Sequence, residues 1–539
     1  MTVHDDRFPT EAAGLPEAAR SQVVELSPGD AFALEIAPVS KRIDEATVRM
    51  LAYNGSIPGP TLKVRQGSEI EVDVVNRGDL EATVHWHGLR LENRYDGTHE
   101  TQAPIAVGGR LRSRVAFPDP GLYWYHPHIR EDYGQEMGLY GNVLVLPEDP
   151  GYWPPVHREL LVTLDDVLIE EGQIASFSRS ETTYTAMGRF GNVLLVAGEP
   201  ELQLTARAGE VVRLYLTDTA NTRVFKVKLP GARMKLVGGD SGRYEHEEFV
   251  EEVVLAPSER VIVDVLFDEP GELALEHHTP DRVYRLAGIS VSRERAEPSL
   301  DEQFDRLRTA PELVAERRRL AASLAAEPDR TLAFIAEMEL EAPGGEGVAY
   351  ACPMHPDVVS EQPGRCPECG MKLLPEAVIA QAGGHHEHHH ETDAHGHDHE
   401  AAGGIEWEDD MVEVNKITTT QNMRWKLVDR STGDENQAIA WRFAVGDRVK
   451  IRLVNEMDSD HPMHHPFHIH GAGRFLILSR DGVVEPNLVW KDTVLVRTGE
   501  TVDILLEVTN PGRWMAHCHI AEHHESGMMF SFDVEEVAP

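Results

Sequence analysis

The sequence is first informative through what is scarce in it, beginning with positive charge. It has 51 lysine and arginine residues against 91 aspartate and glutamate residues, which gives a net charge of −40. Nucleic acids and anionic membrane surfaces would repel such a chain, so we expect neither as a partner. No apolar run approaches the length of about 18 residues that a membrane-spanning helix needs, so we expect no transmembrane helix.

The N-terminus lacks the pattern of a secretory signal, because MTVHDDRFPTEAAG has no basic region followed by an apolar stretch. The chain as given is therefore expected in the cytoplasm, or outside it if a signal has been removed. Cysteine is also scarce: Cys352, Cys366 and Cys369 cluster, and Cys518 stands alone. This spacing is not a disulfide framework. Histidine, by contrast, is abundant, with 28 residues distributed unevenly.

Two sets of repeated segments indicate an all-β fold. QGSEIEVDVVN, AGEVVRLYLTD and VGDRVKIRLVN, starting at Gln66, Ala208 and Val445, each combine a Gly–acid turn with alternating apolar and polar residues. VGGRLRSRVAF, APSERVIVDVLF and TGETVDILLEV form a second set. Strand pairs that recur in this way predict three β-sandwiches.

The spacing of the repeats predicts an insertion between the second and third sandwiches. Residues 300–340 are rich in Ala, Leu, Arg and Glu and predict a helix with a break near Pro311. The predicted organisation is a first β-domain at 1–150, a second at 151–299, a helical linker at 300–343, a metal-binding module at 344–376, a His-rich linker at 377–404 and a third β-domain at 405–539.

Four H-x-H pairs carry the chemistry: His85/His87, His126/His128, His468/His470 and His517/His519. On a strand, residues i and i+2 face the same side, so each pair aims two imidazoles at one point. One pair alone would be read as two partly exposed histidines. Four pairs, two in the first domain and two in the last, predict a multinuclear metal site.

HWHG, YHPH, HPFHIHG and HCHIAEH followed by methionine resemble the four copper-binding motifs of the multicopper oxidases. The likeness covers roughly residues 50–295 and 405–539 and is greatest to three-domain bacterial laccases and copper-efflux oxidases. It implies three cupredoxin-like Greek-key β-sandwiches and four copper ions. It also implies that substrate gives up electrons singly at a type 1 copper and that a trinuclear cluster reduces dioxygen to two waters.

Carried over by position, the resemblance implies a complete ligand set. A thiolate, two imidazoles and a weak thioether suit a blue copper centre. The type 1 ligands would be His465, Cys518, His523 and axial Met528, with Met529 as a neighbour; the type 2 ligands would be His85 and His468; the type 3 ligands would be His87, His126 and His519 on one copper and His128, His470 and His517 on the other.

Proton supply to the cluster is the point at which the sequence departs from the family. Asp96 matches an acidic position that the family uses near the cluster; the alternative is a turn aspartate. Related bacterial enzymes carry glutamate directly after the second type 1 histidine, and this chain has His524 there. Glu522 and Glu525 flank it, and we expect His524 or Glu525 to take the relay role.

The segment YACPMHPDVVSEQPGRCPECGMKLLP resembles small heavy-metal-binding domains of bacterial efflux proteins. Cys352, Cys366 and Cys369 have the spacing of ligands, and His355 would complete a zinc-type set. Met354 and Met371 would instead favour Cu(I). An additional copper or zinc ion is therefore expected in residues 344–376, in a structural or a metal-delivering role. The eight histidines from His385 to His399 form either a copper-collecting tract or a solvated linker.

The sequence constrains the electron donor only loosely. We expect a monomeric laccase-like enzyme that oxidises phenols and aromatic amines with dioxygen. The alternative is an oxidase of Cu(I) or another low-valent metal ion, with an outer site formed by Met457, His461, Met463 and His464. A copper-storage protein without turnover is a third class, disfavoured because the ligand set is complete. Copper nitrite reductases lack the paired type 3 histidines.

Overall fold

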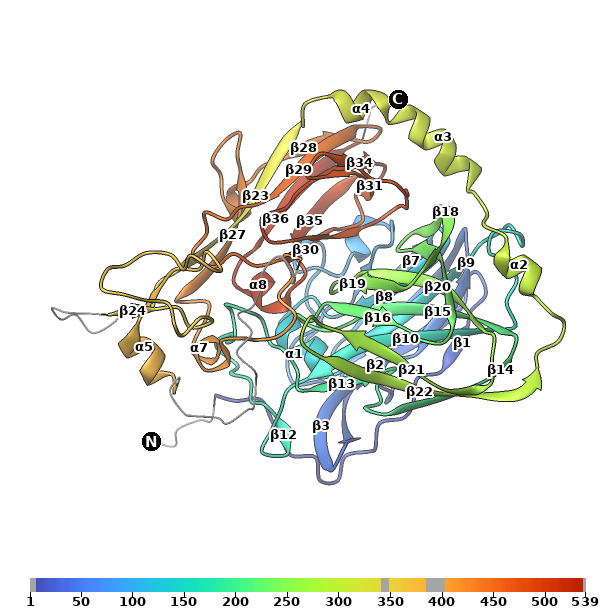
Figure 1. The fold of residues 1–539 in the computed structure, drawn as a ribbon, viewed down its shortest axis with the longest axis horizontal. Coiled ribbons are helices and arrows are strands. Elements are labelled where there is room, and N and C mark those ends of the chain that lie inside the picture. Colours follow the sequence, from blue (N-terminus) through green and yellow to red (C-terminus); the bar gives the residue numbers. More distant parts are fainter. Residues whose placement is uncertain (1–5, 341–348, 384–402, 537–539) are drawn as a thin grey trace.

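The computed structural model describes residues 6–340, 349–383 and 403–536, and in these ranges strands dominate (Figure 1). They form three sandwiches of two sheets each, with a small module beside the third. This confirms the expected all-β fold of three sandwiches with an inserted module. No helix in the described ranges is long and apolar enough to cross a membrane.

The first sandwich packs its two sheets around a core that includes Leu34, Val72, Trp86 and Tyr125. One sheet has the order β3 (Ala46–Tyr53), β2 (Ala31–Ile43), β5 (Ser68–Asn76), β7 (Arg110–Phe117), and the other β1 (Val23–Glu25), β4 (Thr61–Arg65), β9 (Gly141–Leu146), β8 (Gly121–His126), β6 (His85–His87). The short helices η1 (Asn93–Tyr95) and α1 (Glu131–Glu136) follow β6 and β8 in the chain.

The second sandwich repeats this plan. Its sheets have the orders β13 (Val193–Val196), β10 (Arg158–Val167), β15 (Glu210–Asp218), β20 (Arg260–Phe267), β17 (Arg233–Gly239), β18 (Gly242–Val250) and β14 (Leu202–Ala208), β22 (Val283–Arg295), β21 (Gly271–His278), β16 (Phe225–Lys228), β19 (Glu252–Leu255). A small hairpin, β11 (Ile169–Glu170) with β12 (Gln173–Ile174), extends from it.

The third sandwich carries the C-terminal motifs. Its sheets have the orders β27 (Met423–Asp429), β23 (Arg330–Met338), β29 (Arg448–Asn455), β34 (Thr501–Val508), β31 (Gly473–Arg480), β32 (Val483–Val484) and β28 (Arg442–Ala444), β36 (Met529–Glu535), β35 (Gly512–Cys518), β30 (His465–Ile469), β33 (Thr493–Val496). Two one-turn helices, η2 (Asn436–Ala438) and α8 (Ala521–Glu525), complete it.

The repeated segments found in the sequence are the same strand pair three times. β5 with β7, β15 with β20 and β29 with β34 are each antiparallel. Each first strand also has a parallel neighbour on its other side, which is β2, β10 or β23. The three sandwiches therefore share one core topology.

The predicted helix over 300–340 is only partly correct. The chain forms α2 (Asp301–Asp305), α3 (Pro311–Arg319), which begins at the expected proline, and α4 (Ala321–Ala325). Residues 330–338 instead form β23, so the helix prediction is wrong there. Leu332, Phe334, Ala336 and Met338 alternate along this strand into the core, a period of two that outweighs helix-favouring composition. The third sandwich thus begins before the inserted module in the chain, with β23.

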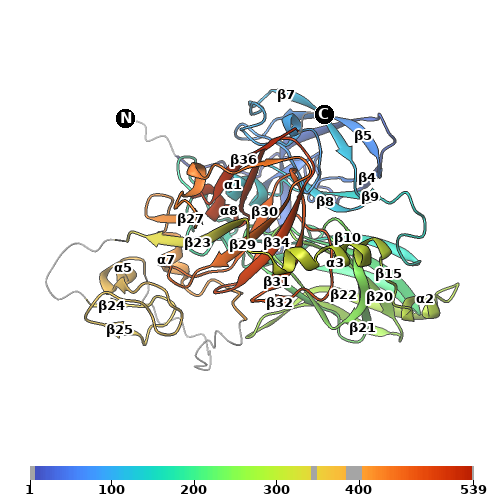
Figure 2. The ribbon, with the colours of Figure 1, turned by 90° about the horizontal axis from the view of Figure 1, so that it is seen from above.

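The inserted module lies beside the third sandwich, at one end of the molecule (Figure 2). It consists of β25 (Val359–Ser360), β24 (Tyr350–Ala351), β26 (Leu374–Pro375) and α5 (Glu376–Gln381); α7 (Val412–Lys416) follows it. Lys372 pairs with Asp460 at 2.9 Å, and Arg365 with Asp458 at 3.1 Å. Its buried cysteines and Met371 belong to the same apolar cluster as the third sandwich. The predicted tract His385–His399 lies outside the described residues.

Candidate metal centres

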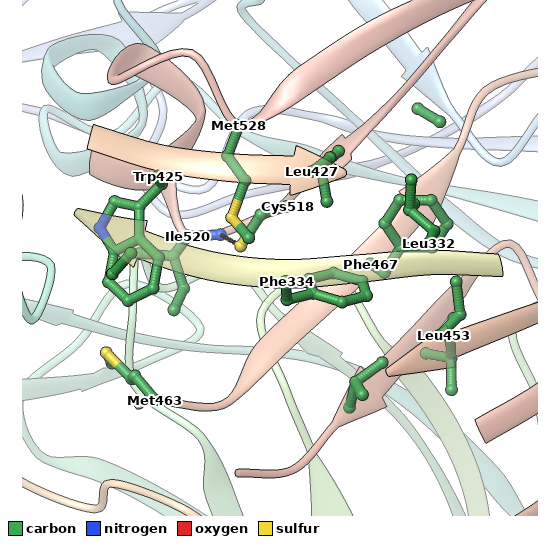
Figure 3. Close-up of a cluster of buried hydrophobic side chains, with 14 of the residues drawn as sticks. Leu332, Phe334, Trp425, Leu427, Leu453, Met463, Phe467, Cys518, Ile520 and Met528 are labelled. Atoms are coloured by element: carbon green, nitrogen blue, oxygen red, sulfur yellow. Dashed lines mark hydrogen bonds between the residues drawn. The ribbon is translucent and has the colours of Figure 1, made fainter. Parts of the chain in front are cut away.

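Cys518 and two imidazoles form a compact triangle between β30, the end of β35 and α8. The Cys518 thiol lies 3.5 Å from His465 Nδ1 and 3.8 Å from His523 Nδ1, and the two Nδ1 atoms are 3.4 Å apart. A metal about 2.0 Å from nitrogen and about 2.3 Å from sulfur, in one plane with them, needs donors roughly 3.5–3.8 Å apart. Figure 3 shows the Met528 sulfur pointing towards this thiol.

The chemistry of this triangle also fits a cation. All three residues are fully buried. Burial raises the pKa of the Cys518 thiol above its usual value, because a thiolate without a counter-charge is poorly solvated there. A bound metal ion supplies that counter-charge and makes the thiolate the stable form.

Trp425 of β27 covers both imidazole rings of the triangle. Its ring stacks on His523 with centroids 4.0 Å apart and meets His465 edge-on at 4.8 Å. Behind it lies a soft pair: His461 Nε2 is 3.1 Å from the Met187 sulfur, and both residues are buried. Met187 belongs to a loop of the second sandwich, and its backbone N–H donates to Asn415 of α7. The Cys518 triangle is thus covered by three parts of the chain.

The eight histidines of the H-x-H pairs converge where the first and third sandwiches meet. Donor atoms of His85, His87 and His126 lie within 4.8 Å of one another, as do those of His128, His470 and His517 and those of His85, His468 and His470. His519 joins them, with its ring 5.0 Å from His126 and 5.1 Å from His87. The expected alternation holds, because His517 and His519 face this cluster whereas Cys518 faces the triangle.

Several ring nitrogens in the cluster need an external partner. Both nitrogens of His126 and of His519 are buried without a hydrogen bond in the described structure, as are His85 Nε2 and His468 Nε2. Buried polar atoms are rarely left in this condition, since each costs roughly 1–3 kcal/mol. Metal ions bound among these atoms would satisfy them, so the residues fit the copper cluster that the sequence implies.

Asp96 lies behind the cluster, where it orients two of its histidines. His470 Nδ1 donates to the Asp96 carboxylate at 2.8 Å, and His85 Nδ1 donates to its backbone carbonyl at 2.7 Å. Burial would raise the pKa of Asp96, but His470 and His85 together hold it below its usual range. Gly97 allows the tight turn: its φ is +86°, and a Cβ there would come within 2.0 Å of the Val84 carbonyl oxygen.

The structure places the three other acid–base candidates differently. The His524 ring lies 4.9 Å from His128 and 4.7 Å from His517, so it adjoins the cluster. Glu525 is one step further out, 3.9 Å from His524 Nδ1. Glu522 turns towards the second sandwich and accepts from Thr222 at 3.3 Å. His524 and Glu525 are therefore near the cluster, whereas Glu522 has its polar contacts elsewhere.

Glu131 adjoins the same cluster and was missed in the sequence. It opens α1, which packs against α8, and is fully buried. Its carboxylate lies 3.3 Å from His128 Nε2 and 3.7 Å from His524 Nδ1. Burial raises the pKa of Glu131 well above its usual value, and the Glu525 carboxylate raises it further. The only sequence signal was an acid three residues after a candidate ligand. Met187 gave no signal, because the loop that brings it to His461 comes from another domain.

The module holds a second thiol–imidazole centre. Cys352 lies 3.7 Å from His355 Nδ1 and 3.6 Å from Cys369, and Cys366 lies 3.6 Å from His355 Nδ1. A tetrahedron of ligands about 2.0–2.3 Å from zinc has edges of roughly 3.5–3.8 Å, so the four donors fit. Glu368 pairs with the outer His355 nitrogen at 3.4 Å, as supporting carboxylates of metal-bound histidine do.

Comparison with known proteins agrees with this geometry. The family described as multicopper oxidase matches residues 36–150 and again 407–538, and the heavy metal binding domain matches residues 349–376. The chain is 25% identical to multicopper oxidase MmcO of Mycobacterium tuberculosis over 97% of this chain and 90% of that protein. It is 24% identical to multicopper oxidase mco of Staphylococcus epidermidis, over 89% of this chain and 82% of that protein.

Solved structures share the architecture as well. The crystal structure of a multi-copper oxidase from Pseudomonas thermotolerans is 25% identical, with a TM-score of 0.64, and the match covers 95% of this chain and 100% of that one. The matched sequence, the shared architecture, the Cys518 triangle and the neighbouring histidine cluster all indicate the same family. The chain therefore belongs to the multicopper oxidase family, whose members bind four copper ions, and carries an inserted heavy-metal-binding domain.

Proposed function

We propose that this chain is an oxidase of Cu(I) or a similarly soft low-valent metal ion, with dioxygen as the electron acceptor. The supporting observation is the buried His461–Met187 pair, 3.1 Å apart and adjacent to the Cys518 triangle. An imidazole together with a thioether is a donor set that binds the soft ion Cu(I) in preference to hard cations. Met457, His461, Met463 and His464 were expected in such a site. Met457 is 48% exposed, and His464 Nδ1 accepts from the Glu406 backbone N–H at 3.0 Å. His461 is therefore the member that carries the proposal, with Met187 added from the second sandwich.

The ligand roles are part of the same proposal. His465, Cys518, His523 and Met528 would hold type 1 copper; His85 and His468 type 2; His87, His126, His519 and His128, His470, His517 the two type 3 ions. Copper ions held by these residues would supply one-electron acceptance at the Cys518 site and, with four electrons and four protons, the reduction of dioxygen to two waters at the histidine cluster. The chain links the two sites covalently, because Cys518 lies between His517 and His519 in the sequence.

Burial of the imidazoles disfavours direct contact of a large aromatic donor with the Cys518 triangle, whereas the His461–Met187 pair beside the triangle offers donors suited to a soft metal ion. His465 and His523 have no exposed surface, and Trp425 is itself about 1% exposed. A phenol therefore has no direct access to a ligand edge. Phenol and aromatic-amine oxidation is the second candidate, and the stacking of Trp425 on His523 favours it, since this ring offers an outer-sphere route for electrons.

Steady-state kinetics of M187L with Cu(I) and with 2,6-dimethoxyphenol test the proposal. Leucine keeps the volume and removes the sulfur, so kcat/KM for Cu(I) should fall about 10- to 100-fold while phenol oxidation is unchanged. M234L, a buried methionine in the core of the second sandwich, is the matched control. Equal Cu(I) kinetics in M187L and M234L, or a wild-type enzyme that oxidises the phenol far more efficiently than Cu(I), would overturn the proposal.

A further inference from the structure

The second sandwich supplies none of the proposed copper ligands, yet one of its arginines reaches the histidine cluster. Arg260, at the start of β20, has no exposed surface. Its Nη1 donates to Asp492 at 2.7 Å and Nη2 contacts the other carboxylate oxygen, while Nε donates to the Leu122 carbonyl at 2.9 Å. Since Leu122 belongs to the first sandwich and Asp492 to the third, this single side chain contacts all three.

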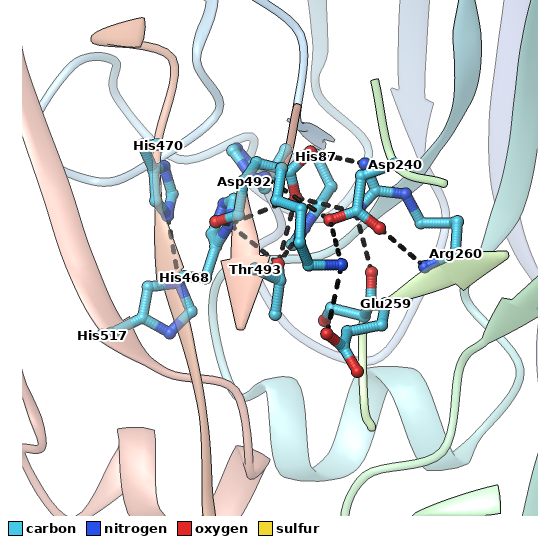
Figure 4. Close-up of polar contacts among 12 residues, drawn as sticks. His87, Asp240, Glu259, Arg260, His468, His470, Asp492, Thr493 and His517 are labelled. Carbon is cyan, nitrogen blue, oxygen red and sulfur yellow. Dashed lines mark hydrogen bonds and ion pairs between the residues drawn. The ribbon is translucent and has the colours of Figure 1, made fainter. Parts of the chain in front are cut away.

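Asp492 and its neighbour Thr493 fix the orientation of two imidazoles (Figure 4). His87 Nε2, from the first sandwich, donates to the Asp492 carboxylate at 3.0 Å and lies 3.1 Å from the Thr493 hydroxyl. His468 Nδ1, from the third, donates to the Asp492 carbonyl at 2.9 Å. These bonds leave His87 Nδ1 and His468 Nε2 as the buried nitrogens without a hydrogen bond, the atoms available to a metal.

The ion pair of Arg260 with Asp492 is part of a larger buried charge network. Asp240 accepts from the Arg260 backbone N–H at 2.9 Å and pairs with Lys491 at 3.1 Å; Lys491 also pairs with Glu259 at 3.2 Å. Two cations thus lie among three carboxylates. Buried ion pairs of this kind contribute little net stability compared with apolar packing. The network is therefore better explained by the positions in which it holds its side chains than by a gain in stability.

We infer that Arg260 is a positioning residue for the copper cluster, acting through Asp492 on His87 and His468. Its fork holds the Asp492 carboxylate at one angle, and that carboxylate fixes the ring of a histidine from another sandwich. A supporting partner of this kind holds both the ring orientation and the nitrogen that faces the metal. The second sandwich therefore sets the geometry at the seam between the other two. The inference rests on the proposed ligands, but not on the identity of the electron donor.

The test compares R260M with R213M in the copper-loaded protein. Arg213 makes a similar buried bidentate pair with Asp264, at 2.7 and 2.9 Å, remote from the histidines, so it reports destabilisation alone. We expect R260M to keep the blue band of type 1 copper, to lose at least half of the type 2 electron paramagnetic resonance signal and to bind fewer copper ions than the wild type. R213M should lower the melting temperature and keep the wild-type copper content.

Two results would overturn the inference: a wild-type resonance spectrum and copper content in R260M, or the same copper loss in R213M. R260K keeps the charge without the bidentate fork and should give an intermediate signal. Should R260M fail to fold, R260K against R213K decides by the same criteria. A wild-type protein that binds fewer than four coppers would instead contradict the proposed ligand set, so the two failures are distinguishable.

Discussion

The two thiol–imidazole centres differ in how their donors are assembled. The module centre takes all four donors from residues 352–369, within one small folding unit, and closes a tetrahedron. The Cys518 centre takes its histidines from β30 and α8 and has three strong donors in a triangle, with methionine on one side. A closed tetrahedron is typical of a structural ion, and an open triangle with a soft axial group of an ion that changes charge. The same residue types are thus arranged in two ways, which differ in the number and geometry of their donors.

C518S is the largest perturbation of this comparison. Serine lacks the soft thiolate, so the blue absorption should vanish and oxygen consumption should fall to background. The metal of the module should remain, because none of its donors changes. Visible spectra, oxygen uptake and elemental analysis measure the three quantities. Residual blue absorption in C518S would contradict the proposed type 1 site.

C369S is the converse change and should act on stability. Removing one of four donors should cost the module more than about 4 kcal/mol, the range that loss of a metal site reaches. Because the module shares an apolar cluster with the third sandwich, faster hydrogen exchange should extend into β23 and β27. The blue band should survive. A C369S protein with wild-type metal content and exchange would show that Cys369 is not a ligand.

H524A tests proton handling, which only the oxygen-reducing cluster needs. Loss of a positioned acid–base group typically lowers turnover about 10²-fold or more, and the nearby carboxylates of Glu131 and Glu525 should limit the loss to about tenfold. H277A, a buried histidine of the second sandwich, is the control. Turnover in H524A equal to wild type at every pH, with copper content intact, would remove His524 from this role.

M528L should give the smallest effect, a raised potential of type 1 copper with modest change in turnover. Leucine removes a weak thioether donor that stabilises the oxidised ion. A redox titration of the blue band measures the change. M529L is the matched control one residue along, and it should leave the potential unchanged. A lowered potential in M528L, or a shift that appears only in M529L, would move the axial role away from Met528.

The sequence could predict what is local and periodic. H-x-H pairs on strands fix their own direction, so His517, Cys518 and His519 could be divided between two centres without coordinates. The repeated turn–strand segments predicted the central strands of all three sandwiches for the same reason. The Cys352–Cys369 spacing likewise carries its own geometry.

What could not be predicted depends on contacts between distant segments. Residues 330–338 have helix-favouring neighbours, and they form a strand because they pair with β29 on one side and β27 on the other. Met187 and Glu131 meet His461 and His524 only after the sandwiches assemble. Arg260 has an ordinary sequence context, since an arginine that begins a strand is usually a surface residue. Tertiary packing decides each of these cases.

The position of β23 has a consequence for the modularity of this chain. Met338 and Met423 are directly opposed in the antiparallel pair of β23 and β27, so everything from 339 to 422 is one hairpin connection. Lengthening a loop is inexpensive, about 0.6 kcal/mol for each doubling, when its ends already meet. The heavy-metal-binding domain therefore enters the chain within one strand-to-strand connection, while its buried cysteines and Met371 pack into the apolar cluster of the third sandwich. A domain of different metal preference placed there would leave the register of β23 and β27 unchanged only if it also filled that cluster.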